Sequence, residues 1–145
     1  MLTVKTIELE AAYRATTYRA YLPGGHVDLR IGEANPNLIA WLETAACREF
    51  AIISAYNPGG EIRAAAINAE RQSQLECDLL EGNYEPYAGE NLPDSTDGPI
   101  EESCFIPEIS CDDACALAED YGQNAIVCGG ADGIPHLVWI VPDVV

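Results

Sequence analysis

The sequence predicts a single domain of the α/β or α+β class, in which a mixed β-sheet is covered by about three helices. The chain has 145 residues, a length typical of one domain, and its 48% apolar residues are enough to build a core. Short apolar or alternating runs, which indicate strands, alternate with segments of helical periodicity. Residues 1–145 contain no internal repeat and no visible domain boundary, so one domain is expected.

The first predicted elements are a hairpin, a helix and a buried strand. Two runs of alternating polarity within residues 17–31 flank a Leu-Pro-Gly-Gly turn, which is typical of a β-hairpin. Asn35 and Pro36 then supply an N-cap and a proline at the first helical position, and apolar residues follow at helical spacing to about residue 47. The continuous apolar run at residues 50–56 has the length of a central strand.

The rest of the chain is predicted to alternate helices and strands. A long helix begins near Glu61 and ends at Gly82, a residue type that often terminates helices. Residues 83–99 are rich in turn formers and acids and are expected to be mostly an exposed loop, with a short strand near Tyr87 as an option. The further predicted elements are a strand at 103–106, a helix from Ser110 to Tyr121, and strands at 124–128 and 136–141.

The negative charge is concentrated in the second half of the chain. The formal net charge is −17, yet residues 1–71 carry eight acidic and seven basic residues, whereas residues 72–145 carry sixteen acidic residues and no lysine or arginine. Binding to nucleic acid or to anionic lipid requires a cationic surface, so we expect neither direct nucleic-acid binding nor membrane binding. No apolar run approaches the ~18 residues of a membrane span, and the first residues lack the apolar core of a signal peptide, so a cytoplasmic location is expected.

The acidic half has three interpretations. It can reflect solubility or adaptation to a salty cytoplasm, which the single lysine fits. It can be a docking face for a basic protein partner that is reached by electrostatic steering. It can also imitate a nucleic acid, with carboxylates in place of phosphates.

Two polar residues of the long predicted helix fall on its apolar stripe. Asn68 and Arg71 share the helical phase of core-type leucines, so both are expected to face inward, where each needs a partner. In a structural interpretation, Arg71 forms a salt bridge with Glu101 or Glu102, and Asn68 bonds a loop backbone.

A functional interpretation places a polar pocket at the same position. Tyr56 and Asn57 end the central apolar strand, where the chain turns toward the long helix. Gln123 lies in a polar patch between a helix and a strand, and it can face the same pocket. These residues would bind a small ligand together with Asn68 and Arg71.

Metal and hydrolytic chemistry find little support in the sequence. Cys111 and Cys115 are one helical turn apart, with Cys104 upstream, but a structural zinc site usually has two close pairs of ligands and the second pair is missing. Motifs of the serine hydrolases and zinc proteases are absent. We therefore expect no metal and no cofactor.

Four segments together carry a family resemblance: IISAYNPGG (52–60), INAERQSQLECDL (67–79), EESCFI (101–106) and AEDYGQNAIVCG (118–129). Their order and spacing resemble the bacterial domain-of-unknown-function family 3293, mainly over residues 50–140. Residues 33–145 fit best, and residues 1–32 form an N-terminal segment with the hairpin. The family has no assigned activity, so the resemblance implies positions: Ala55, Tyr56, Asn57, Pro58, Asn68, Arg71, Glu102, Ser103, Gly122, Gln123 and Asn124.

The leading hypothesis is a non-catalytic binding or interaction protein. Its acidic C-terminal half would dock a basic partner, in one version as a nucleic-acid mimic or inhibitor. The alternative is a small-ligand or enzymatic pocket built on Tyr56, Asn57, Asn68, Arg71 and Gln123. The full set of candidate ligand-binding residues is Tyr56, Asn57, Asn68, Arg71, Glu102, Ser103 and Gln123.

Overall fold

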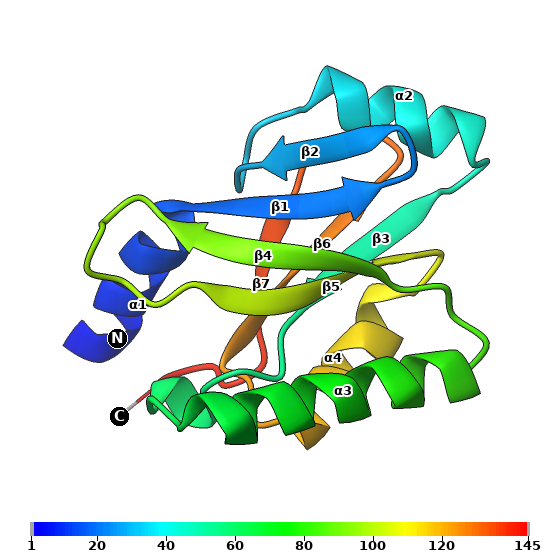
Figure 1. The fold of residues 1–145 in the computed structure, drawn as a ribbon. Coiled ribbons are helices and arrows are strands. Elements are labelled where there is room, and N and C mark those ends of the chain that lie inside the picture. Colours follow the sequence, from blue (N-terminus) through cyan, green and yellow to red (C-terminus); the bar gives the residue numbers. More distant parts are fainter. Residues whose placement is uncertain (1, 145) are drawn as a thin grey trace.

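The structure, a computed structural model, describes residues 2–144 as alternating strands and helices (Figure 1). The elements are α1 (Val4–Arg14), β1 (Thr16–Leu22), β2 (Gly25–Leu29), α2 (Pro36–Thr44), β3 (Glu49–Ile53), the 3₁₀ turn η1 (Pro58–Gly60), α3 (Ala65–Glu81), β4 (Tyr87–Pro93), β5 (Glu101–Pro107), α4 (Cys111–Asp120), β6 (Ala125–Gly130) and β7 (His136–Trp139). The seven strands form one sheet in the order β2-β1-β4-β5-β3-β6-β7. The fold is therefore α+β, one of the two classes predicted.

The centre of the sheet follows a β-α-β-β-α-β pattern. Strands β3, β4, β5 and β6 lie in the order β4-β5-β3-β6, so each helical crossover, through α3 or through α4, skips one strand. The skipped strand lies between the two connected strands and is antiparallel to them. This is the split β-α-β arrangement of ferredoxin-like folds. The hairpin β1-β2 extends the sheet beyond β4, and β7 extends it beyond β6.

The sheet is antiparallel in every pairing, instead of mixed as expected from the sequence. The difference comes from residues 83–99, which were expected to be mainly loop but contain the seven-residue strand β4. Without this strand, α3 would connect β3 directly to β5 and the two would be parallel. With β4 present, β4 and β5 form a hairpin, and β5 enters beside β3 in the opposite direction.

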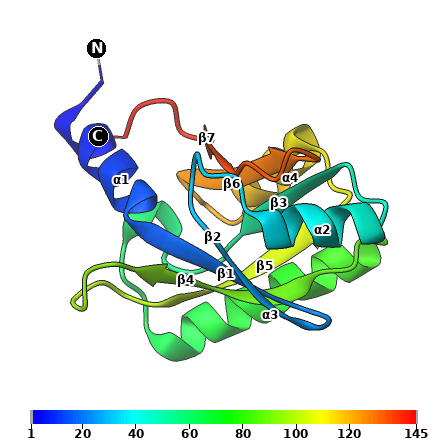
Figure 2. The ribbon, with the colours of Figure 1, turned by 90° about the horizontal axis from the view of Figure 1, so that it is seen from above.

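The two faces of the sheet are covered by different helices. Helices α3 and α4 cover one face together (Figure 1). On this face, Leu75 and Leu79 of α3 pack in one core cluster with Ile53 and Ile106. Helix α2 covers part of the other face (Figure 2). There, Leu38 and residues of β1, β2 and β3 form a second core cluster. The sheet is thus buried on both sides near its centre.

Residues 2–144 contain four α-helices, one more than expected, and the additional helix is α1. α1 buries only Thr6 among its residues, because its apolar side chains are scattered around the helix. It is held instead by hydrogen bonds to the end of the described chain, in which Asp143 accepts from the Thr3 amide at 2.9 Å and from the Thr6 hydroxyl at 2.9 Å. Such partners leave no periodic signal in the sequence. None of the helices within residues 2–144 combines the length and apolar character needed to cross a membrane.

Candidate functional site

The segment between β3 and α3, residues 54–64, is the β3–α3 loop, and most of the predicted site residues meet there. Asn57 has φ 45° and ψ 62°, the left-handed conformation that asparagine tolerates better than most residues. It is followed by the Pro-Gly-Gly turn η1. The helix expected from residue 61 begins only at Ala65, because the Arg63 amide donates to the Asn57 side chain at 2.9 Å and keeps the chain extended.

Asn57 and Asn68 are buried and exchange hydrogen bonds. The Asn57 amide donates to Asn68 Oδ1 at 2.9 Å, and Asn68 Nδ2 donates to Asn57 Oδ1 at 2.8 Å. Both side chains are less than one-tenth exposed. The expectation that Asn68 faces inward and bonds a loop backbone is confirmed.

Arg71 makes no salt bridge with Glu101 or Glu102, so that part of the structural interpretation is wrong. Its guanidinium donates from Nε to the Ala55 carbonyl at 3.0 Å and from Nη2 to the Tyr121 carbonyl at 2.5 Å. It also lies over the Tyr121 ring, 5.7 Å from the centroid. Arg71 therefore joins the β3–α3 loop to the end of α4.

Gln72 belongs to the same network and was missed from the sequence. Its Oε1 accepts from the Ala55 amide at 3.0 Å, and its Nε2 donates to Cys104 Sγ at 3.4 Å. Gln72 is four residues after Asn68 and three before Leu75, so the buried stripe of α3 runs through it and leaves Arg71 at the margin. That spacing is the signal that could have found it.

Gln123 completes the network from the far side of the β3–α3 loop. Its Nε2 donates to the Tyr56 carbonyl at 3.1 Å and to the Tyr121 carbonyl at 3.3 Å. The adjacent Gly122 carbonyl accepts from the Gly59 amide at 2.7 Å. Four polar side chains from α3 and from the α4–β6 connection thus hold the loop backbone in one conformation.

Glu102 and Ser103 do not lie together, because successive strand residues point to opposite faces. The Glu102 carboxylate accepts from the Tyr56 hydroxyl at 2.9 Å, and burial raises the pKa of Tyr56 to about 12 with help from this hydrogen bond. Ser103 is buried on the opposite face, opposite Gly89 of β4. The structure therefore brings Tyr56, Asn57, Asn68, Arg71, Glu102 and Gln123 to the β3–α3 loop and leaves Ser103 apart.

Glu101 is the carboxylate that contacts Asn57. Asn57 Nδ2 donates to Glu101 Oε2 at 2.8 Å. Burial raises the pKa of the Glu101 carboxyl above its ordinary value, while the hydrogen bond from Asn57 acts in the opposite direction. Glu101 was expected only as a partner for Arg71, although strand alternation places it on the face opposite Glu102.

The chemistry available at the β3–α3 loop is mainly that of amides and carbonyls. Most of its polar side chains hold backbone groups, and the Tyr56 hydroxyl pairs with the Glu102 carboxylate. Cys111 Sγ and Cys115 Sγ lie 4.0 Å apart on α4, and burial raises the pKa of Cys115 to about 11. Within residues 2–144, no group of three or more histidine, cysteine or acidic side chains is arranged to hold a metal ion.

A second feature is the acidic surface of the two helices that share one face of the sheet. α3 carries Glu70, Glu76, Asp78 and Glu81, and α4 carries Asp112, Asp113, Glu119 and Asp120. We call these eight residues the α3–α4 acidic face. All are exposed except Asp78, which is half-buried. The only arginine on either helix, Arg71, is turned toward the Ala55 and Tyr121 carbonyls.

The fold and the β3–α3 loop define the class: a small α+β domain with a split β-α-β core and a loop fixed by buried amides. The model of the family described as "Protein of unknown function (DUF3293)" matches residues 53–126. This is slightly more than half of the chain, so the chain belongs to that family, as the resemblance in the sequence indicated. The matched segment runs from the end of β3 to the start of β6. No curated protein and no solved structure shows significant similarity to the chain.

Proposed function

We propose that the protein is a non-catalytic interaction protein of the cytoplasm that docks a basic partner through the α3–α4 acidic face. One observation carries the proposal. Five acidic residues elsewhere in the chain are in ion pairs, but among residues 2–144 none of the eight carboxylates of this face is. The charge there is available to a partner.

The positions of the arginines also support a partner-binding role for the α3–α4 acidic face. Arg19, Arg30 and Arg48 pair with acids on the strands and their connections. Arg71 could neutralise the acidic face but bonds two carbonyls instead. The β3–α3 loop therefore has an electrostatic role in this proposal, because it removes the one arginine of α3 and α4 from their outer surface.

The basic partner would be recognised mainly by long-range attraction. Exposed carboxylates steer an oppositely charged surface and accelerate association, and this effect weakens as salt screens it. Lysine-rich or arginine-rich segments of a protein fit this chemistry, including surfaces that otherwise bind nucleic acid. The six cysteines are all free thiols, which accords with a reducing compartment.

The proposal is tested by two matched quadruple variants. One changes Glu70, Glu76, Glu81 and Glu119 to Gln, and the other changes Glu8, Glu10 and Glu43 to Gln and Asp97 to Asn. Both lower the net negative charge by the same amount. Binding of a fluorescent peptide rich in lysine and arginine is measured by anisotropy at about 50 mM and about 500 mM salt, where screening differs strongly.

The first variant should weaken binding at low salt by about tenfold or more, and the second by about threefold or less. High salt should weaken binding to the unchanged protein. An equal loss in both variants would show that total charge, and not the α3–α4 acidic face, attracts the peptide. Absence of binding at low salt would also contradict the proposal.

A further inference from the structure

A cavity lies on the other side of the sheet from the α3–α4 acidic face. It has a volume of about 370 Å³ and is bounded by α1, β1, the end of β4 and the β4–β5 loop, residues 94–100. A smaller chamber of about 50 Å³ continues inward toward Ser54 and Gln123. Tyr13, Tyr18, Asn91 and Glu101 line both, so the two chambers meet at these four residues.

The sheet register itself assembles three of these residues. Tyr18 of β1 is opposite Asn91 of β4, and Asn91 is opposite Glu101 of β5. Residues directly opposite one another on neighbouring strands point to the same face. The three side chains therefore form a row across the sheet, and Tyr13 adds a second ring from α1.

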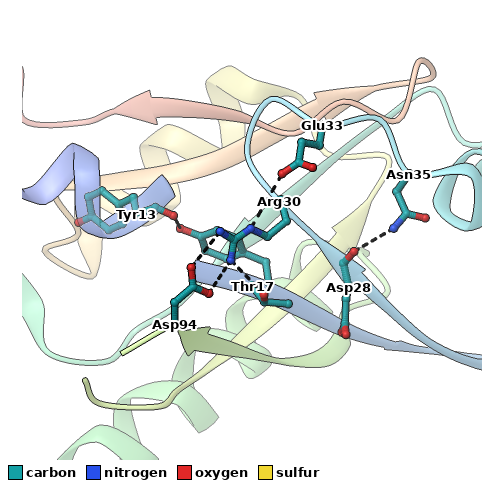
Figure 3. Close-up of polar contacts among 8 residues, drawn as sticks. Tyr13, Thr17, Asp28, Arg30, Glu33, Asn35 and Asp94 are labelled. Carbon is teal, nitrogen blue, oxygen red and sulfur yellow. Dashed lines mark hydrogen bonds and ion pairs between the residues drawn. The ribbon is translucent and has the colours of Figure 1, made fainter. Parts of the chain in front are cut away.

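The β4–β5 loop that walls the cavity is fixed at its start. Asp94 accepts two hydrogen bonds from Arg30, at 2.7 Å and 3.0 Å, and Arg30 also bonds Thr17 (Figure 3). The Asp94 amide donates to the Ala15 carbonyl at 2.9 Å. The Tyr18 hydroxyl donates to the Tyr13 carbonyl at 3.0 Å. These hydrogen bonds fix the backbone on one side of the cavity, so this wall is preformed.

Two of the residues at which the chambers meet, Asn91 and Glu101, carry hydrogen-bond acceptors. Asn91 Oδ1 is buried and has no hydrogen-bond partner, which is unusual for a buried polar atom. The hydrogen bond from Asn57 reaches Oε2 of the Glu101 carboxylate. No lysine, arginine or histidine is among the described residues that line either chamber. The Glu101 carboxylate would repel an anion, whereas a cationic donor would satisfy both acceptors.

We propose that this cavity binds a small organic cation, a primary ammonium or amidinium group on a compact apolar body. The cationic group lies between Asn91 Oδ1 and the Glu101 carboxylate, where it forms charge-assisted hydrogen bonds. The rings of Tyr13 and Tyr18 favour a cation electrostatically. The apolar body occupies the outer chamber against Leu9, Ala12, Pro93 and Pro99. This site does not depend on the α3–α4 acidic face.

The experiment is a calorimetric titration with benzylammonium chloride and with benzyl alcohol, its uncharged match. We expect benzylammonium to bind and benzyl alcohol to bind at least about tenfold more weakly, because a charged donor gains more from the buried acceptors than a neutral one. Glu101→Gln should weaken benzylammonium binding by a similar factor. Glu119→Gln on α4, which changes the net charge equally, should leave it within about twofold.

If Glu101→Gln folds poorly, amide NMR spectra of the unchanged protein provide a second test. In the unchanged protein, benzylammonium should shift the signals of Tyr18, Asn91 and Glu101 and leave those of α4 in place. Equal binding of the two probes would overturn the proposal. Equal weakening by Glu101→Gln and Glu119→Gln would also overturn it, because attraction would then come from the overall field.

Discussion

At the scale of single residues, Asn57 is the centre of the polar network. Its backbone is left-handed, and its side chain accepts from Asn68 and Arg63 and donates to Glu101. A conformation of this kind persists only where surrounding contacts impose it. The buried amide of Asn68 supplies two of these contacts.

Removal of the Asn68 amide should therefore destabilise the protein. Asn68→Ala leaves the Asn57 amide without its acceptor in a buried place, and we expect a loss of about 1–3 kcal/mol in the free energy of unfolding, measured by urea titration. Ser73→Ala, an exposed change on the same helix, should cost less than about 0.5 kcal/mol. A similar small effect at both positions would mean that water replaces the Asn68 contacts.

Glu101 gives a prediction that depends on pH. Its folded-state pKa is raised above the ordinary 4.5, mainly by burial. The protonated carboxyl is therefore favoured in the folded state. Its contribution to stability is fully present below the unfolded-state pKa and is lost as the pH rises through the folded-state pKa. Glu101→Gln, which resembles the protonated acid, should raise the melting temperature at about pH 7 and have little effect near pH 4.

The control for this prediction is Glu119→Gln, which removes an exposed carboxylate of α4. Thermal unfolding of both variants is followed by circular dichroism across the pH range. If Glu119→Gln raises the melting temperature as much as Glu101→Gln, then the gain reflects reduced overall repulsion and not the burial of Glu101.

Residue types and helical phase were enough to select Asn68 and Arg71 as inward-facing, but not to find their partners. Arg71 bonds the Ala55 and Tyr121 carbonyls, and every residue has a carbonyl. A carboxylate partner was expected for Arg71 because acidic side chains are visible in the sequence. The contacts of the backbone become known only when the fold places them.

At the scale of elements, the sequence predicts those with strong periodicity and fails where tertiary contacts decide. The apolar strand β3 and the hairpin β1-β2 were predicted near their observed bounds. β4 was expected only as an optional short strand near Tyr87, because its sequence, YAGENLP, is polar and turn-like. It becomes a seven-residue strand by pairing with β1 and β5 on both sides. α1 was missed because its stabilising contacts involve Asp143 and Val144.

The passage of β6 beside β3 gives an element-scale prediction. Gly129 lies opposite Phe50, and a Cβ at Gly129 would clash with the Phe50 ring, which stacks on Phe105 with centroids 5.3 Å apart. Gly129→Ala should therefore lower the free energy of unfolding by about 1–3 kcal/mol.

The neighbouring glycine is the matched control. A Cβ at Gly130 would be 3.7 Å from its nearest atom, the Arg48 carbonyl oxygen, which is ordinary contact. Gly130→Ala should change the free energy of unfolding by less than about 0.5 kcal/mol in the same urea titration. Equal tolerance of both changes would show that Phe50 moves aside without loss of packing.

At the scale of the whole molecule, charge separates the two layers. The strand layer pairs its arginines with acids, whereas the α3–α4 acidic face keeps its carboxylates unpaired. The sequence showed the excess of acids beyond residue 71 but not that eight of the acids on α3 and α4 share one side of the sheet. That result required the topology, because both crossovers place their helices on the same face.

Salt should consequently stabilise the folded protein. Like charges on one face repel, and the range of this repulsion falls from about 10 Å at 0.1 M salt to about 3 Å at 1 M. We expect the melting temperature to rise with sodium chloride. The Glu70, Glu76, Glu81 and Glu119 to Gln variant should show a smaller rise. A flat response of the unchanged protein would mean that the carboxylates are too dispersed to repel.

The contacts between α1 and the end of the described chain have a mechanical consequence. Thr3 and Thr6 bond Asp143 and Val144, so the two ends lie together. Force that pulls these ends apart would load those few hydrogen bonds before any strand pair of the sheet. α1 should detach first, at low force, and the sheet should resist until a later and larger event in a single-molecule pulling trace.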